Sequence, residues 1–178
     1  MTLNDLFENT LSGAEFSPCR TWRYNLWRCW APEKRMAVFI GLNPSTADEK
    51  VDDPTIRRCI GFARQWGCGG IHMLNLFAFR ATDPKVMKAA TDPVGPDNDA
   101  TIAAVCVNHR PVVACWGVHG EHLGRADAVL AMVDGLKCFG LTKDGYPKHP
   151  LYLPGSAGLI DLKSRAERGT LRGSGDTR

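Results

Sequence analysis

The chain has 178 residues, of which 44% are hydrophobic and 23% charged, values ordinary for a globular protein of one domain. Its net charge of +3 permits binding to nucleic acid without demonstrating it. No apolar run approaches the roughly 20 residues that span a bilayer, and the acidic, mixed N-terminus does not resemble a secretory signal. We therefore expect a cytoplasmic monomer without membrane contact, with one domain over residues 1–163 and a disordered basic tail over 164–178.

The seven cysteines could suggest a metal site or disulfides, but their number is odd and no C-x-x-C pair occurs. No two cysteines are closer in the sequence than Cys59 and Cys68, which are nine residues apart. Several others lie inside apolar stretches such as VVACWG and LKCFG. We interpret the cysteines as buried free thiols in a reducing compartment, and we expect neither a metal nor another cofactor.

The first predicted element is a strand over residues 21–30, where polar and apolar residues alternate and Arg23 belongs to the odd-numbered face. The continuous apolar run over 36–41 predicts a second strand, covered on both faces. A helix follows the acidic stretch after it. Asp53 is placed to cap this helix, and Gly67 to end it.

Strands and helices alternate along the rest of the chain. We predict strands over 71–79, 111–117 and 136–140, helices over 82–90, 96–109 and 119–135, and a Pro/Gly-rich loop over 141–155.

This alternation is typical of a three-layer α/β/α fold, in which helices cover both faces of a central, mainly parallel sheet. Ligands of such sheets bind beyond the carboxyl ends of the strands. Three stretches lie at those ends, and they bring Asn43, Asn75 and His149 to one rim. A site at this rim is therefore the first functional expectation.

Several of these residues also have purely structural interpretations. Asn43 could hold its turn through its own backbone, or it could accept a hydrogen bond from a water and orient it. His149, which precedes a proline, could be an ordinary loop residue. The acids of the stretch after residue 47 could bind a divalent ion, but capping of the following helix is the better interpretation. His119 and His122 are interpreted as an exposed helix start rather than as ligands.

Four motifs in order resemble the uracil-DNA glycosylase superfamily: GLNPS, the strand that ends in Asn75 within GIHMLNLFAFRATDP, PVVACWG, and KHPLYLP. The resemblance covers residues 36–154 and implies a glycosylase-like α/β/α domain. The iron–sulfur branch has a cysteine where this chain has Phe79, so the resemblance implies no cluster. GLNPSTAD together with NLFAFRATDP also resembles a bacterial and phage family of unknown function.

The resemblance implies hydrolysis of an N-glycosidic bond after the target nucleotide is flipped out of DNA. Asn43 would position the attacking water, His149 would donate a hydrogen bond to the base oxygen, and Asn75 would read the edge of the base. The other expected substrate-binding residues are Gly41, Leu42, Pro44, Ser45 and Phe77. The expected DNA-binding residues are Arg80, Lys143 and Lys148 for phosphates, with Leu153 or Tyr152 as the wedge that fills the base stack.

Ser45 gives the sharpest expectation about the substrate. The classical enzymes of the superfamily carry a bulky aromatic residue here, which excludes a methyl group at C5 of the pyrimidine. A serine would admit a C5-modified base, hydroxymethylated or glucosylated, as in phage DNA, with a role in repair or antiviral defence. Ser45 could equally cap a turn. Two other functions stay open: a non-catalytic module that binds nucleic acid or nucleotides, and a hydrolase of free modified nucleotides.

Overall fold

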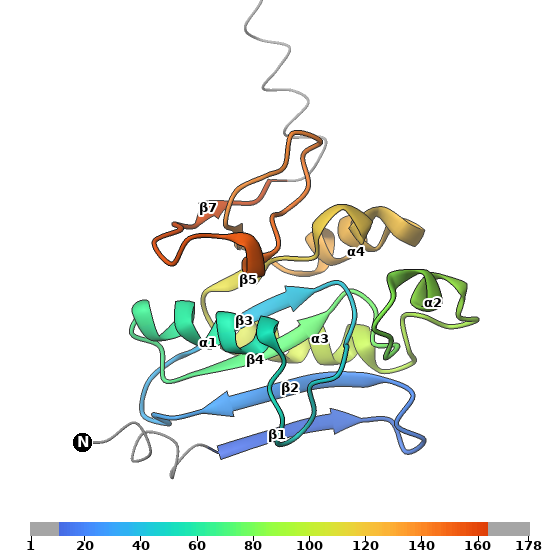
Figure 1. The fold of residues 1–178 in the computed structure, drawn as a ribbon, viewed down its shortest axis with the longest axis horizontal. Coiled ribbons are helices and arrows are strands. Elements are labelled where there is room, and N and C mark those ends of the chain that lie inside the picture. Colours follow the sequence, from blue (N-terminus) through green and yellow to red (C-terminus); the bar gives the residue numbers. More distant parts are fainter. Residues whose placement is uncertain (1–10, 164–178) are drawn as a thin grey trace, which may run out of the picture.

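The computed structural model describes residues 11–163, and the tail predicted over 164–178 lies outside this range. The described chain forms a seven-stranded sheet in the order β1-β2-β4-β3-β5-β6-β7 (Figure 1). The strands are β1 (Leu11–Phe16), β2 (Arg23–Cys29), β3 (Met36–Gly41), β4 (Gly70–Asn75), β5 (Val112–Ala114), β6 (Leu136–Cys138) and β7 (Ile160–Asp161).

The sheet is mixed. Neighbours in the central run β4-β3-β5-β6 are parallel. The pairs β1–β2, β2–β4 and β6–β7 are antiparallel. The expectation of a mixed α/β protein is thus confirmed, whereas a mainly parallel sheet is not observed. The reason is that a hairpin, β1 and β2, extends one edge, and the short strand β7 turns back along β6 at the other.

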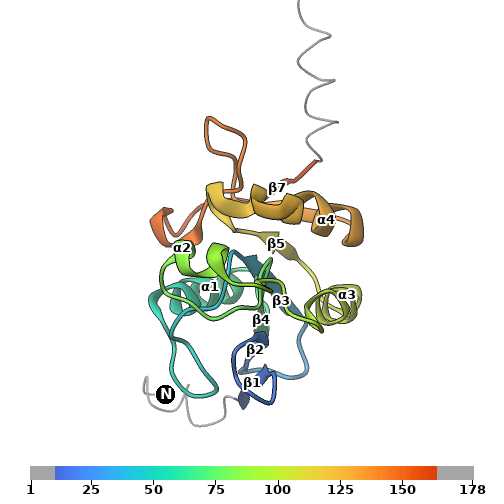
Figure 2. The same ribbon diagram turned by 90° about the vertical axis from the view of Figure 1, so that its right-hand side faces the viewer.

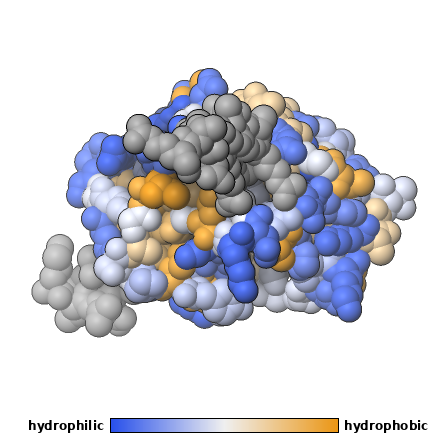
Figure 3. All heavy atoms as spheres, turned by 90° about the horizontal axis from the view of Figure 1, so that it is seen from above, coloured by the Kyte–Doolittle hydropathy of each residue, from blue (hydrophilic) through white to orange (hydrophobic). Residues whose placement is uncertain are grey.

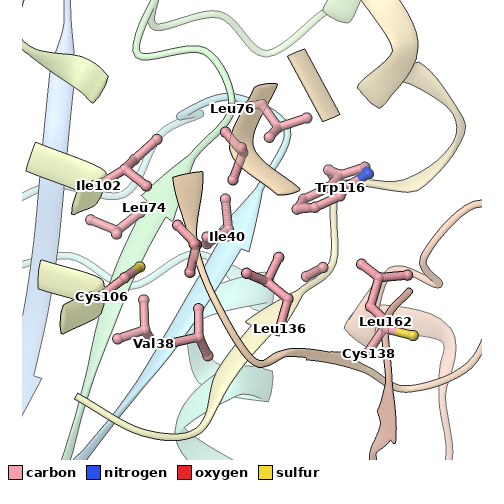
Figure 4. Close-up of a cluster of buried hydrophobic side chains, with 14 of the residues drawn as sticks. Val38, Ile40, Leu74, Leu76, Ile102, Cys106, Trp116, Leu136, Cys138 and Leu162 are labelled. Atoms are coloured by element: carbon pink, nitrogen blue, oxygen red, sulfur yellow. The ribbon is translucent and has the colours of Figure 1, made fainter. Parts of the chain in front are cut away.

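Helices lie on both faces of the sheet. They are α1 (Pro54–Gln65), α2 (Pro84–Ala89), α3 (Asn98–Asn108) and α4 (Arg125–Met132), with short 3-10 helices η1 (Gly117–Gly124) and η2 (Pro150–Tyr152). On one face, Phe39 of β3 packs in a cluster with Phe62 of α1. On the other, Ile40 and Leu74 pack in a cluster with Ile102 of α3 (Figure 4). Figure 2 shows α1 and α3 on opposite sides of the sheet. Alternate residues of each central strand therefore serve two separate cores.

Helix α1 begins and ends where the sequence predicts. Asp53 is the N-cap, and its Oδ1 accepts a 2.8 Å hydrogen bond from the backbone N–H of Ile56. Pro54 opens the first turn, where its missing N–H leaves no bond unmade. Gly67 adopts a φ of 70°, a left-handed conformation that suits glycine and stops the helix.

The single helix predicted over 119–135 is wrong. The segment Gly117–Gly124 is a kinked 3-10 helix, and α4 begins only at Arg125. Leu123 and Gly124 both have positive φ, 54° and 65°, which an α-helix cannot accommodate. The stretch does contain two helical segments, but the backbone turn at Leu123 and Gly124 separates them.

All seven cysteines are free thiols. Six are buried, as expected, whereas Cys19 is exposed in the turn between β1 and β2. Within residues 11–163, no three histidine, cysteine or acidic side chains group together in a way that could hold a metal ion.

The surface carries some apolar side chains. Leu151, Tyr152 and Ile160 are exposed in the C-terminal part of the described chain. The face shown in Figure 3 has an apolar patch bordered by hydrophilic side chains. Among the described residues, no helix combines the length and the apolar character that crossing a membrane requires.

The half-buried ring of His72 should make the free energy of unfolding depend on pH. It packs on His109 with ring centroids 4.6 Å apart, and burial, helped by His109, lowers the pKa of His72 from 6.5 to about 4. Between these pH values the unfolded chain binds a proton that the folded chain does not. The free energy of unfolding should therefore fall by about 1–2 kcal/mol as the pH drops from 6.5 toward 4.

Urea denaturation at about pH 7.5 and about pH 4.5 measures this loss. A His72→Gln variant should lose less stability over the same interval. Equal losses in the variant and the natural protein would contradict the prediction.

Candidate functional site

A cavity of about 740 Å³ opens at the carboxyl ends of the parallel strands. Its walls come from the loop after β3, the N-terminus of α1, the end of β4, the residues before α2, and the segments after β5 and β6. Asn43, Asn75 and His149 all line it. Three residues far apart in the sequence thus meet in one pocket, at the place where sheet topology puts ligands.

Asn43 is fixed by its amide nitrogen. Nδ2 donates to the backbone carbonyls of Ala81, at 2.7 Å, and Pro44, at 3.1 Å. Because both partners are acceptors, the NH₂ must face them, and Oδ1 is the group left to accept a hydrogen bond. Asn43 therefore ties two loops together, lines the cavity, and keeps Oδ1 as an acceptor that the described residues do not use.

Exchanging this amide for a carboxylate should destabilise the protein. In Asn43→Asp, two carbonyl oxygens lose their donor and face an anion, so we expect the free energy of unfolding to fall by about 2–3 kcal/mol. Asn108→Asp is the matched control, because its amide makes one exposed bond of 3.3 Å to Ala104. Chemical denaturation should show the control within about 0.5 kcal/mol of the natural protein. Two variants of equal stability would refute this role of Asn43.

Asn75 ends β4 and is 2% exposed. Its Nδ2 is buried and has no hydrogen-bond partner within residues 11–163. Its Oδ1 lies against Gly41, where an added Cβ would come within 2.9 Å of it. Asn98 holds the backbone here by donating to the carbonyls of Asn75 and Leu76, both at 3.1 Å. The backbone at Asn75 is thus held in place, while the N–H groups of its side-chain amide are unused by the described residues.

His149 is the N-cap of η2, and its Nδ1 accepts a 3.4 Å hydrogen bond from the N–H of Leu151. Burial lowers the pKa of His149, while the charge of Asp53 opposes this shift. At neutral pH the ring is therefore uncharged and carries its proton on Nε2. His149 supplies the cavity with a neutral hydrogen-bond donor.

Only some of the other predicted substrate-binding residues line the cavity. Gly41, Leu42 and Ser45 line the cavity, and the buried Pro44 supports Asn43 through its carbonyl. Phe77 does not reach the cavity. Its ring is fully buried in the core on the α3 side of the sheet, 5.5 Å from the ring of His122. The expected contact of Phe77 with substrate is thus corrected, because β4 ends at Asn75 and the chain then turns toward the other face.

The predicted phosphate-binding cations lie at different distances from the cavity. Lys148 is exposed and lines it. Lys143 is exposed but does not line it. The guanidinium of Arg80 stacks 4.9 Å from the ring centroid of Phe16.

Of the two predicted wedge residues, Tyr152 is 84% exposed beside His149, whereas Leu153 packs against the core. The carbonyl of Leu153 also accepts a hydrogen bond from Arg58. Tyr152 is therefore the side chain free to enter a base stack.

Two charged residues line the cavity that the sequence analysis did not assign to it. Asp53, identified only as a helix cap, contributes a carboxylate there. Arg23, identified only as part of an alternating strand, contributes a guanidinium that is 2% exposed. Asp53 lies in the acidic stretch just before α1, close in sequence to the expected rim. This position could have indicated that Asp53 lines the cavity. No sequence signal marks Arg23.

The fold and the site define a mixed α/β protein with a cavity at the carboxyl ends of its parallel strands, where a few polar side chains stand in a mainly apolar lining. Residues 23–151 match the model of a family described as a protein of unknown function, DUF1643. The chain belongs to this family. No curated protein and no solved structure matches the chain.

The predicted membership of the uracil-DNA glycosylase superfamily is wrong, because the family model that matches is that of DUF1643 and none of that superfamily does. The motifs behind the prediction are short runs at strand ends and in loops. Glycine, asparagine and proline recur at such positions because they suit tight turns.

Proposed function

We propose that the chain is a DNA glycosylase that hydrolyses the N-glycosidic bond of a flipped, C5-modified pyrimidine. The observation that carries the proposal is the meeting of Asn43, Asn75 and His149 in one cavity, each with a hydrogen-bonding group not used by the protein. In this proposal the helices on the two faces of the sheet form the outer layers of a three-layer α/β/α enzyme. No membership of a known glycosylase family is assumed.

Each group has a part in the reaction. The water bound to Asn43 Oδ1 attacks C1′ of the sugar and loses its proton to solvent. The bond from C1′ to the base nitrogen breaks, and its electron pair leaves with the base, which takes up a proton from solvent after release. Negative charge develops on the base, where the Nε2–H of His149 donates to a base oxygen. An amide is a weak base, so stabilisation of the leaving group supplies more of the acceleration than activation of the water. The carboxylate of Asp53 lies in the same cavity and favours the cation-like sugar.

The amide of Asn75 combines a donor and an acceptor, which suits the edge of a pyrimidine base. The cavity volume is well within the range of ligand sites and leaves space beyond an unmodified pyrimidine. Ser45, a small side chain in the wall, is the proposed neighbour of a hydroxymethyl or glucosyl group at C5. Such a substrate places the enzyme in base excision repair or in defence against phage DNA.

DNA is the proposed partner. Lys148 lies at the cavity and Lys143 lies on the same loop, where both are free to contact phosphates. Tyr152 is the proposed wedge. A second candidate function, hydrolysis of free modified nucleotides, is favoured by the position of Leu153, which packs on the core and leaves Tyr152 as the lone wedge.

Alanine variants of Asn43 and His149 test the proposal against a non-catalytic binding module. An enzyme loses release of free base but keeps its affinity for modified DNA within about threefold. If the natural protein releases no base from any oligonucleotide of the full panel of modified bases, the chain is not this enzyme. A variant of Tyr152 to alanine separates the two substrates, because only the hydrolysis of DNA requires the wedge.

A further inference from the structure

Arg23 is a buried cation at the cavity. Its side chain is 2% exposed, and Nη1 donates a 2.6 Å hydrogen bond to the carbonyl of Ala47. Its Nε is buried and has no hydrogen-bond partner in the described part of the chain. No carboxylate of residues 11–163 forms an ion pair with it.

A β-bulge directs Arg23 toward the cavity. The register between β1 and β2 shifts where Glu15 and Phe16 face Asn25 and Arg23, so Tyr24 is the extra residue. Asn25 accordingly points to the α3 side, where its Oδ1 lies 3.2 Å from His72. Regular alternation would send Arg23 to that side as well. The bulge reverses it to the cavity side, and bulges often re-aim side chains in this way beside active sites.

Arg28, on the same strand, has the carboxylate partner that a buried arginine normally has. It is 3% exposed, donates from Nε to Asp52 at 2.9 Å, and forms an ion pair with the same carboxylate at 2.8 Å. Arg23 has no such partner, although the more distant charges of Asp53 and Asp48 favour its charged form. Burial lowers the pKa of Arg23 to about 10, so it remains charged at neutral pH. An unpaired buried charge is unfavourable unless a ligand completes it.

We propose that Arg23 binds an oxyanion of the ligand, a carboxylate or a phosphate. The planar fork of a guanidinium matches both groups and holds them with two parallel hydrogen bonds. The charges of the cavity also favour an anionic ligand. Lys148 adds a second cation, and Asp53 is the one carboxylate among the described lining residues. This anion subsite goes beyond the proposed hydrolysis, in which Lys148 and Lys143 contact the phosphates of DNA and Arg23 has no part.

Calorimetric titration with three matched ligands tests the subsite: deoxyuridine, its 5′-monophosphate, and 5-carboxydeoxyuridine. The choice of pyrimidine ligands rests on the proposed function. Inorganic phosphate is the fourth ligand, and its use does not depend on that function. At least one anionic ligand should bind about tenfold or more tightly than deoxyuridine. The ligand that does so identifies the source of the oxyanion, a sugar phosphate or an acidic base substituent.

Arg23→Gln should abolish this preference, and Arg23→Lys should keep part of it, since lysine retains the charge but not the fork. Arg28→Lys is the control and should keep the full preference, because Arg28 does not line the cavity. Equal binding of charged and neutral ligands, or a preference that survives in Arg23→Gln, would overturn the proposal. Failure of base release would leave these binding results unchanged, so the two proposals fail separately.

Thermal unfolding distinguishes a binding role from a structural one. Arg23→Gln should change the Tm by at most about 2 °C, because the side chain lacks a charged partner. Arg28→Gln should lower the Tm by about 5–10 °C, because it leaves Asp52 half-buried and unpaired. A large drop in Arg23→Gln, without a change in anion preference, would assign Arg23 to the fold instead.

Discussion

Replacing His149 with alanine is expected to lower the rate of base release about 100- to 1000-fold, the usual effect of removing one donor to a developing oxyanion. The ring carries its proton on Nε2, because Nδ1 accepts a hydrogen bond from Leu151. Without the ring, negative charge on the departing base has no donor at this position. Single-turnover measurement of free base gives the rate of the chemical step.

The pH profile gives a second readout for His149. Burial lowers its pKa below the usual 6.5, so the neutral form is present throughout the range above pH 6.5. The rate should therefore show no inflection from His149 between pH 6.5 and about 8, and any such inflection should lie at lower pH.

His119, an exposed histidine that also lines the cavity, is the matched control. His119→Ala should change the rate less than about threefold. A His149 variant with near-natural activity would remove this residue from the mechanism.

Replacing Asn75 with leucine is expected to separate function from stability. The amide nitrogen of Asn75 is buried without a partner, so a leucine of similar size should leave the free energy of unfolding unchanged or raise it by about 1 kcal/mol. The same change removes the group that reads the base, so kcat/KM should fall about 100-fold or more.

Asn98→Leu is the matched control for this prediction. Asn98 is fully buried and uses its Nδ2 to satisfy two backbone carbonyls. Its loss leaves those carbonyls unpaired, so denaturation should show a decrease of about 2–4 kcal/mol in the free energy of unfolding. Strong destabilisation by Asn75→Leu, with activity retained, would show that Asn75 serves the fold.

Much of the fold was predictable because its signals are local. The run MAVFIG is apolar throughout since β3 is covered on both faces, and DPT carries the N-cap and first turn of α1. The meeting of Asn43, Asn75 and His149 was predictable too, because the carboxyl ends of neighbouring parallel strands share one edge of the sheet.

The remaining features depend on contacts that are distant in the sequence. The edge strands β1 and β7 are short or polar and are defined by their neighbours. The bulge that aims Arg23 at the cavity arises from the pairing of β1 with β2, and alternation along β2 alone predicts the opposite face. The unpaired amide of Asn75 is likewise visible only once its surroundings are known.

The most direct test of the central claim is mass-spectrometric detection of free base. The protein is incubated with duplex and single-stranded oligonucleotides that carry cytosine, uracil, thymine, or their hydroxymethyl and glucosyl derivatives at one position. We expect release of a C5-modified base, with an abasic site left in the DNA, and loss of that release in His149→Ala. Intact oligonucleotides throughout the panel, or release of unmodified uracil alone, would contradict the account.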